Sequence, residues 1–280
     1  MYNNGSMAAH APSDTYSNPL SRLSFHSRPL PALSQEQQAQ VEARFLTVIE
    51  RLGLALSEEQ VEGFRHYQRE LERWNQRTNL TAITGYEEVF TLHFLDSLSV
   101  LLALTGNDAL GGASRLLDVG AGAGFPGLPL KIVVPDIQLT LLEATAKKTA
   151  FLDTLAASLG LDGINVLTDR AETAAHQEAH REQYDVVVSR GVAKLATLAE
   201  FLLPFCNVGG IAIAMKQGDL STELAEAERA IALLGGTLEQ IIAVDLPGLP
   251  PGRQLVALRK AQPTPPAYPR RAGLPAKRPL

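Results

Sequence analysis

A short apolar run that ends in alternating glycines constrains this chain more than any other stretch. The run at residues 115–119 is short enough for a buried strand, and Gly120, Gly122 and Gly124 follow it at alternate positions. Glycine adopts a positive φ without strain and has no Cβ to hold a ligand away from the main chain. Apolar residues then return at helical spacing over residues 128–133, so the pattern predicts strand, glycine loop and helix. Such a loop is typical of a nucleotide-like ligand bound at the start of a helix.

Two interpretations of these glycines compete. Residues 122–127 (GAGFPG) formally satisfy the dinucleotide fingerprint G-x-G-x-x-G, but the first glycine comes late after the strand. Counted from Gly120, Phe125 occupies the place of the third glycine. Residues 118–124 fit D-x-G-x-G-x-G, which resembles the first motif of the S-adenosylmethionine (SAM) methyltransferases. We therefore favour a methyltransferase over a dehydrogenase-type Rossmann domain or a ligand-free glycine turn.

Composition places the chain among ordinary globular proteins. It has 280 residues, of which 45% are hydrophobic and 20% charged, and no apolar run is long enough to span a membrane. The single cysteine, Cys206, leaves no partner for a disulfide and no cysteine-based metal site. We therefore expect a cytoplasmic protein that needs neither a membrane nor a metal.

The charges are distributed unevenly. The chain has a net charge of −5, yet residues 259–280 carry six basic residues and no acidic one. A basic end on an acidic body could bind phosphates. Composition alone nevertheless favours a solvated, disordered end.

The chain divides into four parts. Residues 1–34 are rich in Ser, Pro, Asn and Ala without periodicity, which predicts a disordered N-terminal tail. Residues 35–110 carry helical patterns, including a capping-box sequence at 57–60, and predict an N-terminal helical layer. Residues 111–260 alternate strand and helix patterns and predict a SAM-binding core, and residues 261–280 form a basic, Pro-rich tail without a core-forming pattern.

Alternating strands and helices after the glycine loop predict a mostly parallel, doubly wound α/β sheet. We expect strands near 138–142, 164–168, 184–189, 209–215, 237–244 and 253–259, helices near 127–134, 146–160, 192–205 and 220–235, and an earlier helix over 87–104. The last two strands have no full helix between them, which predicts an antiparallel hairpin at the end of the sheet.

Ligands of such sheets bind outside the carboxyl ends of the strands, and several of these ends are polar. The second strand ends in Glu143, whose carboxylate could accept hydrogen bonds from both ribose hydroxyls of an adenosine. After the third strand, the backbone around Ala171 and the carboxylate of Glu172 could bind the edge of an adenine. The alternatives are an exposed acid at a strand end for Glu143 and an acid at a helix start for Glu172.

The next two strand ends are basic. Arg190 ends the fourth strand and Lys216 the fifth, and Lys194 follows close by. These cations predict a basic mouth for an anionic substrate or for the carboxylate of SAM. Arg190 could instead be a structural ion-pair partner. His93 and Asp96 share one helix face, where they could contact substrate or cross-link the helical layer.

Several segments, in order over roughly residues 40–260, together resemble one family, the GidB-type methyltransferases of bacterial small-subunit ribosomal RNA. The matching segments are WNQRTNLT at 74–81, HFLDS at 93–97, DVGAGAGFPGLPLK at 118–131, LLE at 141–143 with lysines at 147–148, RAE at 170–172 and SR at 189–190. Gly191 stands where the family more often has alanine.

This resemblance implies a Rossmann-like SAM-dependent methyltransferase fold, with a seven-stranded, mostly parallel sheet and an N-terminal helical layer. It implies SAM as cofactor, with Gly120, Phe125, Ala171, Glu172 and Arg190 in contact with it. The remaining candidates for binding SAM are Gly122, Gly124 and Glu143. The implied partner is 16S ribosomal RNA or the small ribosomal subunit, and the implied product is a guanine methylated at N7.

Guanine N7 carries a lone pair and no proton at neutral pH, so no general base is required and we assign no catalytic residue. A bidentate contact from Arg190 to guanine would occupy the reacting lone pair. We therefore expect Arg190 to hold the SAM carboxylate or a flanking phosphate. The competing function is a small-molecule SAM methyltransferase, in which the helical layer would be a lid.

Overall fold

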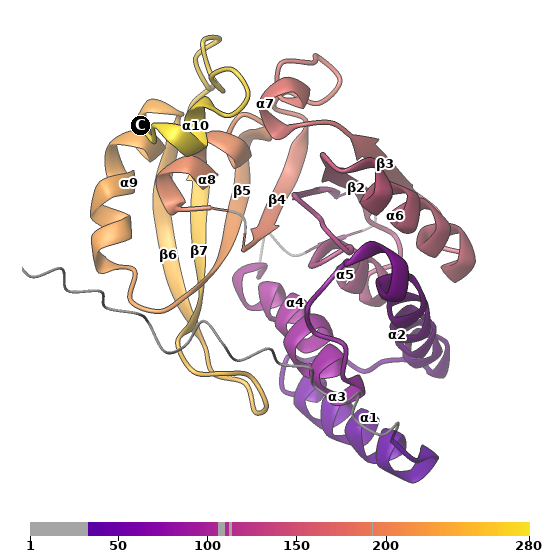
Figure 1. Ribbon diagram of the computed structural model, residues 1–280. Coiled ribbons are helices and arrows are strands. Elements are labelled where there is room, and N and C mark those ends of the chain that lie inside the picture. Colours follow the sequence, from indigo (N-terminus) through magenta and orange to yellow (C-terminus); the bar gives the residue numbers. More distant parts are fainter. Residues whose placement is uncertain (1–32, 106–109, 112–113, 192) are drawn as a thin grey trace, which may run out of the picture. The chain divides into compact units, whose positions relative to one another are not determined.

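The computed structural model of Figure 1 describes residues 33–105, 110–111, 114–191 and 193–280. The tail expected at residues 1–34 lies almost entirely outside the described residues. Leu33–Leu280 forms one compact unit, so the helical layer and the core expected from the sequence fold together.

A seven-stranded sheet in the order β3-β2-β1-β4-β5-β7-β6 forms the centre of this unit. The strands are β1 (Arg115–Val119), β2 (Gln138–Glu143), β3 (Ile164–Thr168), β4 (Tyr184–Arg190), β5 (Cys206–Gln217), β6 (Gly236–Val244) and β7 (Arg253–Lys260). Strands β1 to β5 pair in parallel, and β7 runs antiparallel to both β5 and β6. The predicted sheet and its closing hairpin are confirmed. The strand order reverses between β1 and β4, which is where doubly wound sheets bind their ligands.

Helices cover both faces of the sheet. They are α5 (Gly127–Val133), α6 (Ala146–Leu159), α7 (Ala171–Ala174), α8 (Leu195–Leu202) and α9 (Ser221–Leu233). Side chains alternate between the two faces of a strand, so Val186 and Val188 join the apolar cluster of α5 and α6, whereas Val187 joins that of α8 and α9. No helix among the described residues is long and apolar enough to cross a membrane.

Two capped helices begin the N-terminal layer, α1 (Gln35–Glu50) and α2 (Glu58–Thr78). The predicted capping box of α2 is confirmed: Ser57 Oγ accepts from Gln60 N at 3.2 Å, and Ser57 N donates to Gln60 Oε1 at 2.9 Å. The Gln60 amide also donates to the Ile132 carbonyl at 2.9 Å, which joins the start of α2 to α5.

The prediction of a single helix over residues 87–104 is wrong in detail. The chain forms α3 (Tyr86–Glu88), a π-helical turn (Val89–Leu95), α4 (Asp96–Leu98) and a 3₁₀ turn (Ser99–Ala103). The apolar pattern shows that this segment is helical and buried, but a pattern cannot reveal one extra residue within a turn. Such π-helical turns are frequent at functional sites.

The prediction of a solvated, disordered end after residue 260 is also wrong. Thr264 is only 4% exposed, and Tyr268 packs against the cluster of α8 and α9. The final short helix, α10 (Leu274–Lys277), lies beside α8 (Figure 1). Polar contacts to the chain's own backbone hold this segment, so hydrophobic periodicity gives no sign of it.

Gly127→Ala tests how tightly the helix after the glycine loop fits the sheet. A Cβ at Gly127 would lie 2.8 Å from Leu141 Cδ2 and 3.0 Å from Asp118 Oδ2. We expect a free energy of unfolding lower by about 1–3 kcal/mol, measured by urea denaturation. Gly111→Ala is the control, because its Cβ would meet nothing within 4 Å. Equal stability of the two variants would contradict the close packing.

Candidate functional site

A cavity of about 480 Å³ lies at the carboxyl ends of β1, β2 and β4. It is lined by Val119, Gly120, Leu142, Glu143, Ala144, Lys148, Asp169, Arg170, Ala171, Glu172, Arg190, Gly191, Phe201, Gly273 and Ala276. The structure thus brings together Gly120, Glu143, Ala171, Glu172 and Arg190 from the residues that the sequence singled out. Gly122, Gly124, Phe125 and Lys216 do not line the cavity.

Glu143 is held in place by backbone N–H groups. It ends β2 and is only 7% exposed. Its Oε2 accepts from Gly122 N at 3.1 Å and its Oε1 from Thr145 N at 2.9 Å, while Lys148 Nζ lies 3.8 Å from Oε2. Each carboxylate oxygen keeps a further lone pair for a ligand. Gly122 therefore orients Glu143, the predicted ribose acceptor, and its own contact with SAM stays a prediction.

Gly124 makes room for the side chains of Tyr67 and Leu128 and does not line the cavity. Its φ is +96°, and a Cβ there would lie 2.6 Å from both Tyr67 Oη and Leu128 Cδ1. The Tyr67 hydroxyl donates to the Ala123 carbonyl at 2.5 Å. The absent side chain thus lets α2 dock against the loop. A contact between Gly124 and SAM stays a prediction.

The ring of Phe125 is enclosed by the helical layer and is only 4% exposed. It stacks on Tyr67, with centroids 5.2 Å apart and planes 5° apart, and on His93, at 4.3 Å and 16°. The Arg190 guanidinium carbon lies 4.8 Å from its centroid, a cation–π arrangement. Phe125 therefore joins the glycine loop to α2 and to the π-helical turn, and its predicted contact with SAM remains untested.

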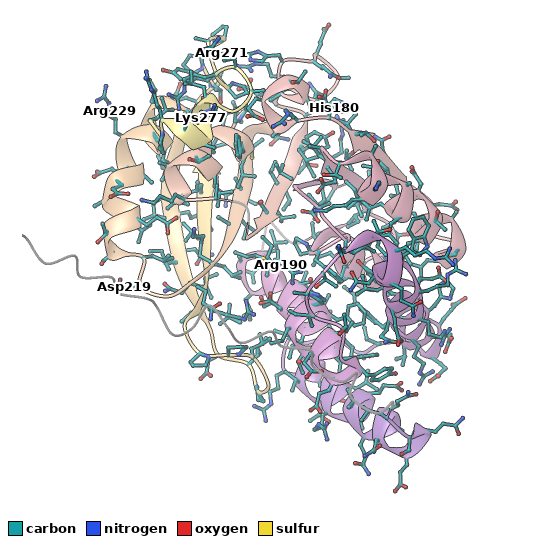
Figure 2. All side chains as sticks on the ribbon, in the orientation of Figure 1. His180, Arg190, Asp219, Arg229, Arg271 and Lys277 are labelled. Atoms are coloured by element: carbon teal, nitrogen blue, oxygen red, sulfur yellow. The ribbon has the colours of Figure 1, made fainter. Side chains whose placement is uncertain are left out.

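The Arg190 guanidinium is bound to the helical layer. Its Nη1 donates to the Leu92 carbonyl and to Asp96 Oδ2, both at 3.2 Å, and its Nη2 lies 3.1 Å from His93 Nδ1. Asp96 also pairs with Arg253 at 3.1 Å. Figure 2 shows Arg190 next to α4. The structure thus shows the ion-pair role that the sequence left open. Because Arg190 also lines the cavity, a contact with the SAM carboxylate or with a phosphate stays a prediction.

His93 is neutral in this arrangement. Burial, together with the positive charge of Arg190, lowers the pKa of His93 to about 3. Arginine can only donate, so His93 Nδ1 accepts, and Nε2 carries the hydrogen that is donated to Thr81 Oγ1 at 2.8 Å. As the pH falls from about 6.5 towards 3, the unfolded chain binds a proton here that the native chain does not, so stability declines. His93 and Asp96 cross-link the helical layer to β4.

The expected basic mouth is neutralised by acidic residues of α9. Lys216 Nζ lies 2.6 Å from Glu223 Oε1 and donates to the Ala193 carbonyl at 3.0 Å. Lys194 pairs with Glu226 at 3.5 Å. With Arg190 bound to Asp96, the strand ends carry little unpaired positive charge, and the expectation of a basic mouth there is wrong. A substrate or cofactor contact by Lys216 stays a prediction.

Asp118 is a buried acid of β1, next to the glycine loop. It is fully buried, and burial raises its pKa to about 7. Its Oδ2 accepts from Gly127 N at 2.8 Å, while Oδ1 has no partner among the described residues. Cys206 is also buried, which raises its pKa to about 12 and makes it a poor nucleophile. Nowhere in the described ranges do three or more His, Cys, Asp or Glu side chains gather as a metal site.

Part of the cavity wall comes from residues that the sequence did not indicate. Phe201 belongs to α8, and Gly273 and Ala276 belong to the C-terminal segment. Lys148 and Arg170 lie within segments matched to the family but had no assigned role. No pattern points to Gly273, because its place in the wall depends on long-range polar contacts.

Comparison with known proteins decides the family. The GidB model, described as rRNA small subunit methyltransferase G, matches residues 60–249. The chain belongs to the GidB family. The suspected family, the methyltransferase class of the enzyme and its Rossmann-like fold are thereby confirmed.

Relatives of similar length carry the same description. "Ribosomal RNA small subunit methyltransferase G" of Dehalococcoides mccartyi strain CBDB1 is 52% identical over 229 residues, covering 82% of this chain and 95% of that protein. The protein of the same name from Roseiflexus castenholzii is 49% identical over 228 residues, covering 81% and 95%. Among solved structures, TrmN from Thermus thermophilus superposes with a TM-score of 0.45 at 18% identity, covering 61% of this chain and 53% of that one.

The hydrogen-bond pattern at His93 predicts its protonation state. At about pH 5 we expect a neutral imidazole with the proton on Nε2, because Arg190 and burial oppose protonation. The ¹⁵N chemical shifts of the ring in isotopically labelled protein report both properties. The same ring in urea-unfolded protein is the control and should titrate near 6.5. A protonated ring at about pH 5 in the native protein would contradict the arrangement.

Proposed function

We propose that this GidB-family enzyme transfers the methyl group of SAM to N7 of a guanine in 16S ribosomal RNA. The observation that carries this proposal is the cavity with Glu143 and Glu172 in its wall, in a chain that spans nearly the whole length of relatives named for the small-subunit RNA. Such a substrate places the reaction in the cytoplasm.

The cavity fits SAM in size and chemistry. Its volume of about 480 Å³ lies within the usual range for small-ligand sites. Leu142, Phe201 and Ala276 provide apolar contact for the faces of a purine. Glu143 is positioned for the ribose hydroxyls and Glu172 for the 6-amino group. When bound, SAM supplies an electrophilic methyl group.

The lining of the cavity supports transfer without a general base. Among its described residues there is no histidine, and its carboxylates already accept N–H hydrogen bonds from the chain. Asp169 accepts from Arg170 N at 2.7 Å and from Gln177 Nε2 at 3.0 Å, and Glu172 accepts from Gly273 N at 2.7 Å. Guanine N7 has no proton to lose. The chain's task is then to orient the two reactants, and orientation is a large source of rate enhancement.

The helical layer weighs against the small-molecule alternative. A lid must be able to move away from the site. Here Phe64, Tyr67 and Phe94 are fully buried, and Tyr67 is hydrogen-bonded to the loop itself. This layer is part of the core that shapes the loop, so nothing in its packing favours a lid over a small substrate.

Unpaired cations lie around the cavity and suit a polyanionic substrate. Arg170 lines it, and Arg271 and Lys277 flank the lining residues Gly273 and Ala276. No acidic residue in the described part of the chain pairs with these three. Arg271 and Lys277 are exposed, and Figure 2 labels both near the C-terminal segment. On an acidic chain, such cations favour an RNA backbone as partner.

Mapping the transferred methyl group tests the proposal directly. Labelled SAM is offered with 16S RNA, both naked and in small subunits from cells that lack this gene. We expect one labelled nucleotide, identified by mass spectrometry as N7-methylguanosine. Label at another atom, or no labelled RNA while SAM still binds, would contradict the proposed substrate.

Glu143→Ala tests the ribose acceptor. Hydrogen bonds to a charged group contribute about 1.5–3 kcal/mol, so SAM affinity measured by calorimetry should fall at least about tenfold. Glu50→Ala, an exposed acid at the end of α1, is the matched control and should leave affinity unchanged. Unchanged affinity in folded Glu143→Ala would remove Glu143 from the cofactor site.

A further inference from the structure

The C-terminal strap, residues 261–280, is attached to the core mainly through backbone carbonyls. The Arg181 guanidinium donates to the carbonyls of Thr264 at 2.8 Å and Tyr268 at 2.9 Å. His176 Nε2 lies 2.7 Å from the Pro269 carbonyl. A segment rich in proline has few N–H groups of its own, so side chains of the core supply the donors.

A buried ion pair holds the strap at Arg270. The Glu200 side chain on α8 is fully buried, and it accepts from Arg270 N at 2.7 Å, from Nε at 2.9 Å and from Nη2 at 2.6 Å. Because the buried Glu200 carboxylate accepts several hydrogen bonds from Arg270, it restricts the position of both the side chain and the backbone of that residue. The pair therefore fixes the chain three residues before Gly273.

Gly273 is where the strap reaches the cavity. Its N–H donates to Glu172 Oε1 at 2.7 Å, and both residues line the cavity with Ala171 and Ala276. Glu172 is only 6% exposed, and no other hydrogen bond to its carboxylate comes from a described residue. Its Oε2 is thus the acceptor that remains for a ligand. The φ of +78° at Gly273 explains why glycine stands there.

We propose that the C-terminal strap is the purine-side wall of the SAM cavity, and that Arg270 and Gly273 are positioning residues that orient Glu172 towards the 6-amino group of the adenine. The inference rests on the proposed cofactor but not on the RNA substrate. One carboxylate oxygen binds the strap and the other binds the ligand, so the docking of the strap and the selection of adenine are coupled through one side chain.

The choice of ligand makes this coupling measurable. S-adenosylhomocysteine offers a 6-amino donor, whereas S-inosylhomocysteine carries a 6-oxo acceptor that would oppose the Glu172 carboxylate. A site built around a hydrogen bond rejects an analogue that cannot make it. We expect the wild-type chain to bind S-adenosylhomocysteine at least about tenfold more tightly than the inosyl analogue.

The test uses a variant that weakens the attachment of the strap without leaving a buried charge unpaired. The double variant Glu200→Gln/Arg270→Met removes both charges, and the amide oxygen that it introduces on α8 can still accept from the backbone of the strap. Calorimetry should show weaker binding of S-adenosylhomocysteine and a preference over the inosyl analogue reduced at least about threefold. Arg278→Met, at an exposed arginine of the same strap outside the pair, should keep the wild-type preference. Glu172→Gln should lose the preference for S-adenosylhomocysteine over the inosyl analogue.

Hydrogen exchange on the wild-type protein gives a second measurement that does not depend on a variant folding. Amides of the strap around Gly273 should become more protected when S-adenosylhomocysteine is bound, because the ligand and the strap share Glu172. An unchanged preference in the folded double variant, or unchanged protection, would overturn the inference. Failure of the wild-type chain to bind S-adenosylhomocysteine at all would instead overturn the proposed function and this inference with it.

Discussion

The burial of one aromatic ring, that of Phe125, holds the glycine loop against the helical layer. A loop with three glycines has many accessible conformations, and ordering it costs conformational entropy. Phe125 offsets part of that cost by stacking on Tyr67 and on His93, and the Tyr67 hydroxyl binds the loop at Ala123. The helical layer therefore favours one loop conformation through Phe125 and Ala123, neither of which lines the cavity. Residues outside the cavity wall thus help to shape the loop whose first glycine, Gly120, lines the cavity.

Several polar residues of the family motif also bind the backbone at the two ends of α5. Lys131 is only 1% exposed, and its ammonium donates to the carbonyls of Pro135 and Ile137 at 2.5 and 2.6 Å. It thereby satisfies carbonyls just beyond the end of α5, where a cation is favoured. Asp118 binds the first N–H of the same helix through Oδ2. Arg190 and His93 likewise bind one another instead of standing free. Around this site, the charged residues of the motif mainly form hydrogen bonds and ion pairs within the protein.

Features that depend on local sequence patterns were predicted correctly, whereas features that depend on contacts between distant residues were not. β4 was expected at 184–189 and occupies Tyr184–Arg190, because a buried parallel strand is a continuous apolar run. The carboxyl ends of strands then placed Glu143, Glu172 and Arg190 at one cavity. The π-helical turn, the ion pair of Lys216 and the choice of Asp96 as the partner of Arg190 were not predictable, since they depend on which distant acid or ring a side chain meets. Local patterns place residues at the site, and only tertiary contacts decide what each one binds.

In the C-terminal strap, too, the local sequence pattern and the tertiary contacts point to different structures. Its composition, basic and rich in proline, is that of a solvated end, and it buries few apolar side chains. Order comes instead from polar groups on the core, chiefly Arg181 and the partner of Arg270, Glu200. Those donors and acceptors belong to segments that precede the strap, so the strap docks on a surface that the rest of the fold has already made. The cavity that opens at the end of β1 is therefore complete only when the last twenty residues of the chain, 261–280, are in place.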